Sequence, residues 1–192
     1  MSALRAEPTA VTFTHRPATP ADVPALERLA QAAIAELQAS FLSPAQVAAS
    51  RAIMGIDTRL VADGTYYVVE HDGELAGCGG WSRRATLYGG DHTSGRDDAL
   101  LDPAVDPARI RAMYTDPRYV RRGVGRLVLA VCEAAAAAEG FTTLELMATM
   151  AGQPLYTACG FVAVEQLDDA STGTPIPLVR MTKSIASTTP AA

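Results

Sequence analysis

Residues 119–129 read YVRRGVGRLVL. Two glycines, Gly123 and Gly125, stand one residue apart among arginines, and an apolar run with helical spacing follows them at once. The first amide groups of a helix have no partner within it and lie at the positive end of its dipole. A glycine there lets an anion approach the backbone, and arginines add charge-assisted hydrogen bonds. The stretch therefore favours a loop that binds phosphate or pyrophosphate at the start of a helix.

Two familiar glycine motifs do not fit this stretch. A dinucleotide fingerprint needs a third glycine where Val128 stands, and a P-loop needs a lysine that is missing here. The competing explanation is a basic loop before a helix, with no ligand. Arg121, Arg122 and Arg126 would then oppose the helix dipole by roughly a few tenths of a kcal/mol each. Nothing structural recommends that arrangement, so we expect an anionic ligand.

The segments around this loop alternate between strand and helix patterns. Apolar and polar residues in alternation predict strands over residues 11–16, 65–70, 74–81, 109–116, 142–147, 161–165 and 176–183. Helical spacing and capping residues predict helices that follow Thr19, Ser43 and the glycine loop, and a short helix over 152–159. Helices interspersed among strands and hairpins predict a mixed sheet with helices packed on its faces.

The apolar residues within these elements predict which faces are buried. In the strand over 109–116, one face should carry Ile110, Ala112 and Tyr114, and the other Arg111, Met113 and Thr115. The helix after the glycine loop should bury Leu127, Val128, Val131, Ala134, Ala135 and Ala138. Gly77, Gly79 and Gly80 indicate either a bulge or the close approach of a ligand or another backbone. Residues 83–107 form either a functional lid or a disordered loop.

Composition limits the classes of partner. The formal net charge of −5 argues against a nucleic-acid binder, which usually shows a basic face. No apolar run is long enough to span a membrane, and the first residues lack the apolar segment of a secretory signal. The three cysteines and three histidines are scattered, which predicts no metal site and reduced thiols. We therefore expect a cytoplasmic protein without metal, membrane or nucleic-acid partners.

Three segments carry a family resemblance. YVRRGVGR at 119–126 resembles the acyl-CoA pyrophosphate loop of the GNAT superfamily of N-acetyltransferases, although Val120 stands where that family usually has Gln or Arg. RPATPADVPAL at 16–26 resembles the family's first strand–helix junction, and PLYTACGF at 154–161 its fourth helix. The resemblance implies an α/β fold of the α+β type, with a mostly antiparallel mixed sheet of about seven strands and helices on both faces. A single domain over 11–183 would then lie between flexible ends at 1–10 and 184–192.

The resemblance also implies a reaction. Acetyl-CoA would be the co-substrate, and a primary amine would attack its acetyl group directly in a ternary complex. The thioester would lie in a cleft between strands 109–115 and 142–147. Tyr156 stands where the family often places the acid that protonates the leaving thiolate; the alternative is a tyrosine that packs and binds CoA. The implied cofactor-binding residues are Tyr114, Thr115, Arg121, Arg122, Gly123, Val124, Gly125 and Arg126.

Two matters stay open in the sequence. The general base is not identified, because the family often uses a glutamate on the strand over 109–116, where only Asp116 stands at the end. Glu145, Asp91, His92 and a water relay are the alternatives. The acceptor is a small-molecule or peptide amine, and a homodimer is left open. An alternative function is an acyl-CoA-binding sensor or interaction module with little or no catalysis.

Overall fold

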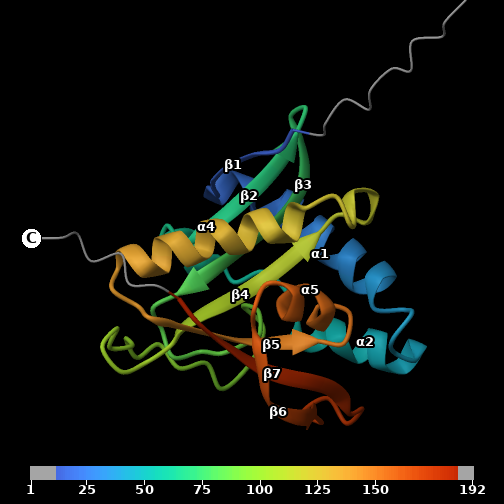
Figure 1. The fold of residues 1–192 in the computed structure, drawn as a ribbon. Coiled ribbons are helices and arrows are strands. Elements are labelled where there is room, and N and C mark those ends of the chain that lie inside the picture. Colours follow the sequence, from blue (N-terminus) through green and yellow to red (C-terminus); the bar gives the residue numbers. More distant parts are fainter. Residues whose placement is uncertain (1–11, 186–192) are drawn as a thin grey trace, which may run out of the picture.

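The computed structural model describes residues 12–185, in which a central sheet is covered by helices (Figure 1). The strands are β1 (Thr14–Pro17), β2 (Tyr66–His71), β3 (Glu74–Ser82), β4 (Ala108–Thr115), β5 (Thr143–Thr149), β6 (Val162–Asp169) and β7 (Ile176–Ser184). The helices are α1 (Val23–Leu37), α2 (Pro44–Ile53), α3 (Thr58–Ala62), α4 (Val124–Ala138) and α5 (Gln153–Ala158). Short 3-10 turns, η1 (Pro20–Asp22) and η2 (Pro117–Tyr119), precede α1 and α4. The predicted flexible ends fall almost wholly outside the described residues.

The sheet has seven strands in the order β1-β2-β3-β4-β5-β7-β6. Every neighbouring pair is antiparallel except β4 and β5, which run parallel. This arrangement confirms the predicted fold class. The parallel pair is short: only Ala108 with Leu144 and Arg109 with Glu145 are in register. Beyond these two pairs β4 and β5 diverge, so the sheet opens in its middle.

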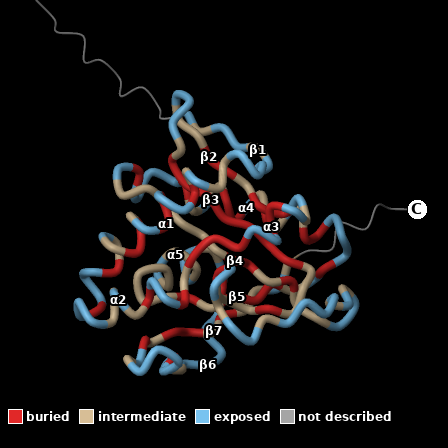
Figure 2. The backbone as a smooth tube through the Cα atoms, turned by 180° about the vertical axis from the view of Figure 1, so that it is seen from behind, coloured by how far each residue is buried: buried red, intermediate tan, exposed pale blue. Residues whose placement is uncertain are grey.

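Helices cover both faces of the sheet, because successive strand residues point to opposite faces. Val68 of β2 packs in a core with α1 and α3, whereas its neighbour Val69 packs in the core beneath α4. In Figure 1, α4 crosses one face of the strands β2, β3 and β4. Figure 2, seen from behind, shows buried residues concentrated along the central strands and exposed residues on the turns around them.

The buried face of α4 differs from the predicted one. Ala134 and Ala138 are exposed, although helical spacing from Leu127 would bury them. The second half of α4 is almost entirely alanine, so its periodicity barely distinguishes one face from another. Tertiary packing decides instead. The buried residues are Val124, Val128, Leu129, Cys132, Ala136 and Ala137.

The glycines of β3 explain how α4 is seated. A Cβ built on Gly79 would lie 2.8 Å from Val128 Cγ1, and one built on Gly77 would collide with Val124. On Gly80 it would lie 2.6 Å from a backbone oxygen of the neighbouring strand region. These glycines therefore allow a helix and a backbone to approach β3 closely, and the pairing of β3 with β4 also shifts register there. The glycines therefore mark both a bulge and a close approach, and the groups that approach them belong to the protein itself.

A bulge in β4 changes which of its residues share a face. Ala112 has a positive φ of 49°, and the pairing with β3 shifts between Cys78 and Gly80. One extra residue in a strand moves all later side chains to the opposite face. The prediction that Ile110 shares a face with Ala112 and Tyr114 is therefore wrong. Ile110 packs beneath α4, whereas Ala112 and Tyr114 pack on the α1 side.

Residues 83–107 form a folded loop. Leu101 N donates to Arg83 O at 2.8 Å, and Thr86 Oγ1 donates to Asp97 O at 2.7 Å. The guanidinium of Arg111 in β4 also donates to the Thr86 carbonyl at 2.8 Å. The loop is thus fastened to the sheet. No described helix is both long enough and apolar enough to cross a membrane.

Candidate functional site

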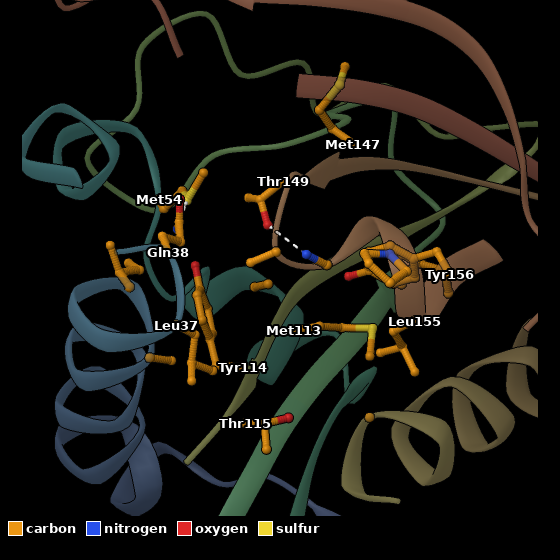
Figure 3. Close-up of a pocket in the computed structure, with 18 of the residues that line it drawn as sticks. Leu37, Gln38, Met54, Met113, Tyr114, Thr115, Met147, Thr149, Leu155 and Tyr156 are labelled. Atoms are coloured by element: carbon orange, nitrogen blue, oxygen red, sulfur yellow. Dashed lines mark hydrogen bonds between the residues drawn. The ribbon is translucent and has the colours of Figure 1, made fainter. Parts of the chain in front are cut away.

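A pocket of about 750 Å³ opens where β4 and β5 part. Figure 3 shows Leu37, Gln38 and Tyr114 on one side of it and Leu155 and Tyr156 on the other. Its walls come from α1, the link between α2 and α3, the loop 83–107, β4, the start of α4, the end of β5 and α5. Residues far apart in the sequence therefore meet at one opening in the sheet. The cleft lies between the two strands that the sequence predicted for it.

The start of α4 contributes backbone amide groups to this pocket. Gly123 is the N-cap residue, with a φ of 97°, and Arg121 just before it also has a positive φ, 63°. Leu127 N is the first amide to reach an acceptor in the preceding turn, Gly123 O at 3.0 Å. The amides of the first helical turn have no such acceptor. Gly123, Val124 and Gly125 all line the pocket, so these donors border it.

The two glycines of this turn have different structural reasons. A Cβ on Gly123 would meet nothing within 4 Å, so its positive φ is what requires glycine. A Cβ on Gly125 would lie 2.6 Å from Leu155 Cδ2. Gly125 therefore lets α5 pack directly against the start of α4, which brings Tyr156 on α5 to the same pocket.

The three arginines of the loop are not equivalent. Arg121 and Arg126 line the pocket, and both are exposed. Arg122 does not line it; its guanidinium carbon lies 5.8 Å from the centroid of the Tyr119 ring. Seven of the eight predicted cofactor-binding residues thus border one cavity, and Arg122 does not. Two of the positive charges lie beside the amides at the start of α4.

The part of β4 that borders the pocket has no strand on one side. Residues Ala112 to Thr115 line the cavity, and none of them pairs with β5. An unpaired strand edge can accept an extended molecule through main-chain hydrogen bonds.

The Tyr114 hydroxyl donates to Gly55 O at 3.2 Å, which holds the link between α2 and α3 against β4. Burial raises the pKa of Tyr114 above its usual value.

Tyr156 presents an unpartnered hydroxyl. Its ring packs edge-on against Phe161 with 5.9 Å between the centroids, and the residue lines the pocket. Within residues 12–185 no group forms a hydrogen bond with its hydroxyl. Burial raises the pKa of this phenol, so it is protonated at neutral pH. The hydroxyl is therefore available to donate a hydrogen bond to a ligand.

The carboxylates considered as general bases have other partners. Glu145 is buried and forms ion pairs with Arg109 and Arg180. Asp116 accepts from Arg118, whose hydrogen bonds lower the pKa of that carboxyl. Neither of them lines the pocket. Each carboxylate is already paired with arginine, which points to a structural role.

The two candidates from the long loop are also engaged elsewhere. Asp91 accepts the Thr58 amide at 3.1 Å and forms an ion pair with Arg96. His92 lies against Gly55, where an added Cβ would stand 2.9 Å from His92 Cε1. Neither of them lines the pocket. Among residues 12–185, no set of three or more His, Cys, Asp and Glu side chains is placed to hold a metal ion.

A buried ion pair beside the pocket was missed by the sequence reasoning. Arg111 Nη2 lies 3.0 Å from Asp57 Oδ2, and both side chains are only 2% exposed. Asp57 also binds Arg96 at 2.5 Å, and Arg111 donates to Gly89 O at 2.8 Å. Burial lowers the pKa of Arg111, and Asp57 opposes that shift. No signal in the sequence indicated this pair, because alternation placed Arg111 on the opposite face from Ile110, Ala112 and Tyr114.

The sequence and the structure were compared with known proteins. The family model described as Acetyltransferase (GNAT) family matches residues 29–161. A GCN5-related N-acetyltransferase (Aminotransferase, Class-II) from Rhodopseudomonas palustris is 22% identical, has a TM-score of 0.68, and the match covers 94% of this chain and 100% of that one. Comparison with curated proteins gave no match.

Two of the similar structures were solved with a ligand of the CoA type. PaiA N-acetyltransferase from Thermoplasma acidophilum, in complex with coenzyme A, is 14% identical with a TM-score of 0.63, over 91% of this chain and 99% of that one. YncA from Salmonella typhimurium, with its cofactor acetyl-CoA, is 17% identical with a TM-score of 0.61, over 94% of this chain and 98% of that one. At such identities the likeness shows a shared fold.

Proposed function

Because the chain belongs to the acetyltransferase (GNAT) family and is accordingly an acyltransferase, we propose that it transfers the acetyl group of acetyl-CoA to a primary amine. The observation that carries this proposal is the single cavity that joins the start of α4 to the opening between β4 and β5. One end offers amide donors and arginines to an anion. The other end reaches a separate set of walls, where a second substrate has room.

The residues present fit acetyl-CoA. The amides of Gly123, Val124 and Gly125 would hold its pyrophosphate, together with the charges of Arg121 and Arg126. Arg122, beside the Tyr119 ring, would add positive charge at longer range. Valine is acceptable at position 120 because the turn would bind through its main-chain amides. The unpaired edge of β4 at Tyr114 and Thr115 would take the extended pantetheine arm as an added strand.

The acetyl thioester supplies an activated carbonyl that a free amine attacks directly. The new carbon–nitrogen bond forms, the carbon–sulfur bond breaks with its electron pair on sulfur, and the amine loses one proton. The Tyr156 hydroxyl would donate a hydrogen bond, and then its proton, to the departing sulfur. Burial raises the pKa of Tyr156 above the value of about 10 for a free phenol, so full transfer of its proton to a thiolate of pKa about 8.5 is uphill by more than roughly 2 kcal/mol. Tyr156 therefore acts mainly by stabilising the negative charge that develops on sulfur.

The amine proton needs a path that does not depend on a lining base. The described residues around the cavity include no Asp, Glu or His. A water relay that leads from the cavity to solvent is therefore the route that we propose for this proton. The same water would return a proton to Tyr156 after each turnover.

Turnover with a panel of amines tests the proposal. The protein is incubated with acetyl-CoA and each amine, and released thiol and acetylated product are both measured. Thiol release that depends on an amine, with matching product, supports acetyl transfer. Thiol release without any amine would indicate hydrolysis instead, and tight binding of acetyl-CoA without product would favour a non-catalytic acyl-CoA sensor. The family match does not favour that alternative.

A further inference from the structure

The acceptor end of the pocket is apolar. Its walls lie away from the start of α4 and come from α1 and the turn after it, the α2–α3 link, the loop 83–107, β5 and β7. The side chains that form these walls, which we call the acceptor wall, are Ala33, Ile34, Leu37, Phe41, Met54, Leu87, Met147 and Leu178. Part of this wall belongs to a small core formed by Leu42, Ile53, Ile176 and Leu178. Apolar surface of this kind binds apolar surface.

Within residues 12–185, the acceptor end of the pocket has no lining carboxylate that could pair with a cationic amine. The described residues that line the cavity carry no carboxylate, and their only charged side chains are arginines. Two carboxylates that contact lining residues have partners: Asp57 pairs with Arg111, and Asp169 accepts a hydrogen bond from the Tyr88 hydroxyl at 2.9 Å. A cationic amine that entered would lose water without gaining a counter-ion, which is unfavourable.

The polar groups near the acceptor wall are mostly satisfied within the protein. The Tyr114 hydroxyl donates to Gly55 O, and Thr149 Oγ1 accepts the Gly152 amide at 3.2 Å. Gln38 Nε2 contacts the Met54 sulfur at 3.2 Å. The Tyr156 hydroxyl is the clear exception. A pocket built this way selects by shape and apolar contact, with one polar group at the reacting end.

We propose that the acceptor is a weakly basic primary amine on an apolar skeleton, such as an arylamine; this rests on the proposed acetyl transfer. The amine must be uncharged to attack, and the cavity offers no base to remove a proton. An alkylamine with a pKa near that of lysine is uncharged in only about one molecule in 2,500 at neutral pH. An arylamine is uncharged there and can occupy the apolar wall without a counter-ion.

Two isomeric amines have nearly the same apolar size and differ in basicity. At pH 7, 4-ethylaniline is neutral and 2-phenylethylamine is cationic. Their binding to the protein saturated with desulfo-CoA is measured by calorimetry, and their acetylation is measured with acetyl-CoA. We expect 4-ethylaniline to bind at least about tenfold tighter, a difference of 1.4 kcal/mol. Spermidine, a polycation, should not bind. Tighter binding of either cation, or no binding of 4-ethylaniline, would overturn the inference.

The calorimetric binding measurement does not require turnover. It therefore tests the acceptor class separately from the proposed acetyl transfer. Selective binding of 4-ethylaniline without acetylation would reject acetyl transfer and keep the acceptor class. A charge variant tests where the selectivity arises: Phe41→Glu places a carboxylate on the acceptor wall, at a residue that is 53% exposed. It should shift preference toward 2-phenylethylamine severalfold. The matched control Leu100→Glu, at an exposed residue outside the pocket, should leave the preference unchanged.

Discussion

Asp57 and Arg111 face each other across 3.0 Å with almost no access to solvent, and they join the α2–α3 link to β4. Arg111 also holds the carbonyl groups of Thr86 and Gly89, so the same guanidinium fastens the loop 83–107. Three parts of the pocket therefore depend on one buried charge pair. Removing one member of such a pair leaves the other charge buried and uncompensated, which costs far more than the pair contributes.

The variant Asp57→Asn tests this dependence. It should lower the free energy of unfolding by about 3–5 kcal/mol, because Arg111 would keep its charge without a counter-ion. Urea unfolding followed by circular dichroism measures the loss. The control Glu74→Gln removes an exposed partner of Arg118 and should cost less than about 1 kcal/mol. Equal losses in the two variants would contradict the structural role given to Asp57.

The variant Tyr156→Phe removes an unpartnered hydroxyl that borders the pocket. We expect kcat for acetyl transfer to fall about a hundredfold, while the affinity for acetyl-CoA changes little, because the hydroxyl acts on charge that develops in the transition state. Steady-state kinetics and calorimetry separate the two effects. Tyr67→Phe, at a tyrosine that does not line the pocket, is the matched control. An unaltered kcat would assign Tyr156 to packing alone.

Alanine variants of two glycines can separate the effect of backbone strain on stability from the effect on ligand binding. Gly123 and Gly173 have positive φ values of 97° and 81°, and an added Cβ would meet nothing at either position. Alanine at each should therefore destabilise the fold by a similar amount, about 1 kcal/mol. Only Gly123 borders the pocket, so only Gly123→Ala should weaken acetyl-CoA binding, by about tenfold or more. Calorimetry that finds the same affinity in both variants would reject the cradle at the start of α4.

Acid should remove stability at the start of α1. Arg16 makes two hydrogen bonds of 2.9 Å to Asp22, which hold the pKa of that carboxyl far below its usual value. A depressed carboxyl pKa contributes stability above the ordinary value of about 4, and this is lost as the pH falls through the lower folded value.

The variant Asp22→Asn should therefore be less stable than the parent at pH 7, by about 1–2 kcal/mol, and the difference should shrink below about pH 4. Urea unfolding at pH 7, 5 and 3 measures the trend. Asp72→Asn, at a side chain that is 89% exposed, should show no such trend. A difference that grows toward low pH would contradict the assigned sign.

Local chemistry accounts for what the sequence predicted well. Gly123 and Gly125 with their arginines indicated the start of a helix, whereas Tyr156 was implied only by the family resemblance. The strand positions followed from the alternation of apolar and polar residues, and the helix after Thr19 from its capping residues and helical spacing. These features depend on neighbours in the chain, which a single sequence displays directly.

What was missed depends on contacts between distant residues. The bulge at Ala112 leaves no mark in the sequence, yet it moves Tyr114 to the opposite face from Ile110. The five-residue helix α3 is too short to show a period. The ion pair of Asp57 and Arg111 joins positions far apart in the chain, so neither residue indicates its partner. The apolar acceptor wall is assembled from five segments and exists only once they fold together.

The short pairing between β4 and β5 has a consequence for the lifetime of the protein in a cell. Within residues 12–185, two registered residue pairs make up the backbone pairing between a four-stranded half of the sheet and a three-stranded half. A molecule seated in the opening would bridge both halves and raise the free energy of unfolding in proportion to the logarithm of its concentration. We expect proteolysis to slow when the co-substrate is plentiful. Cellular abundance of the protein would then follow metabolic supply as well as synthesis.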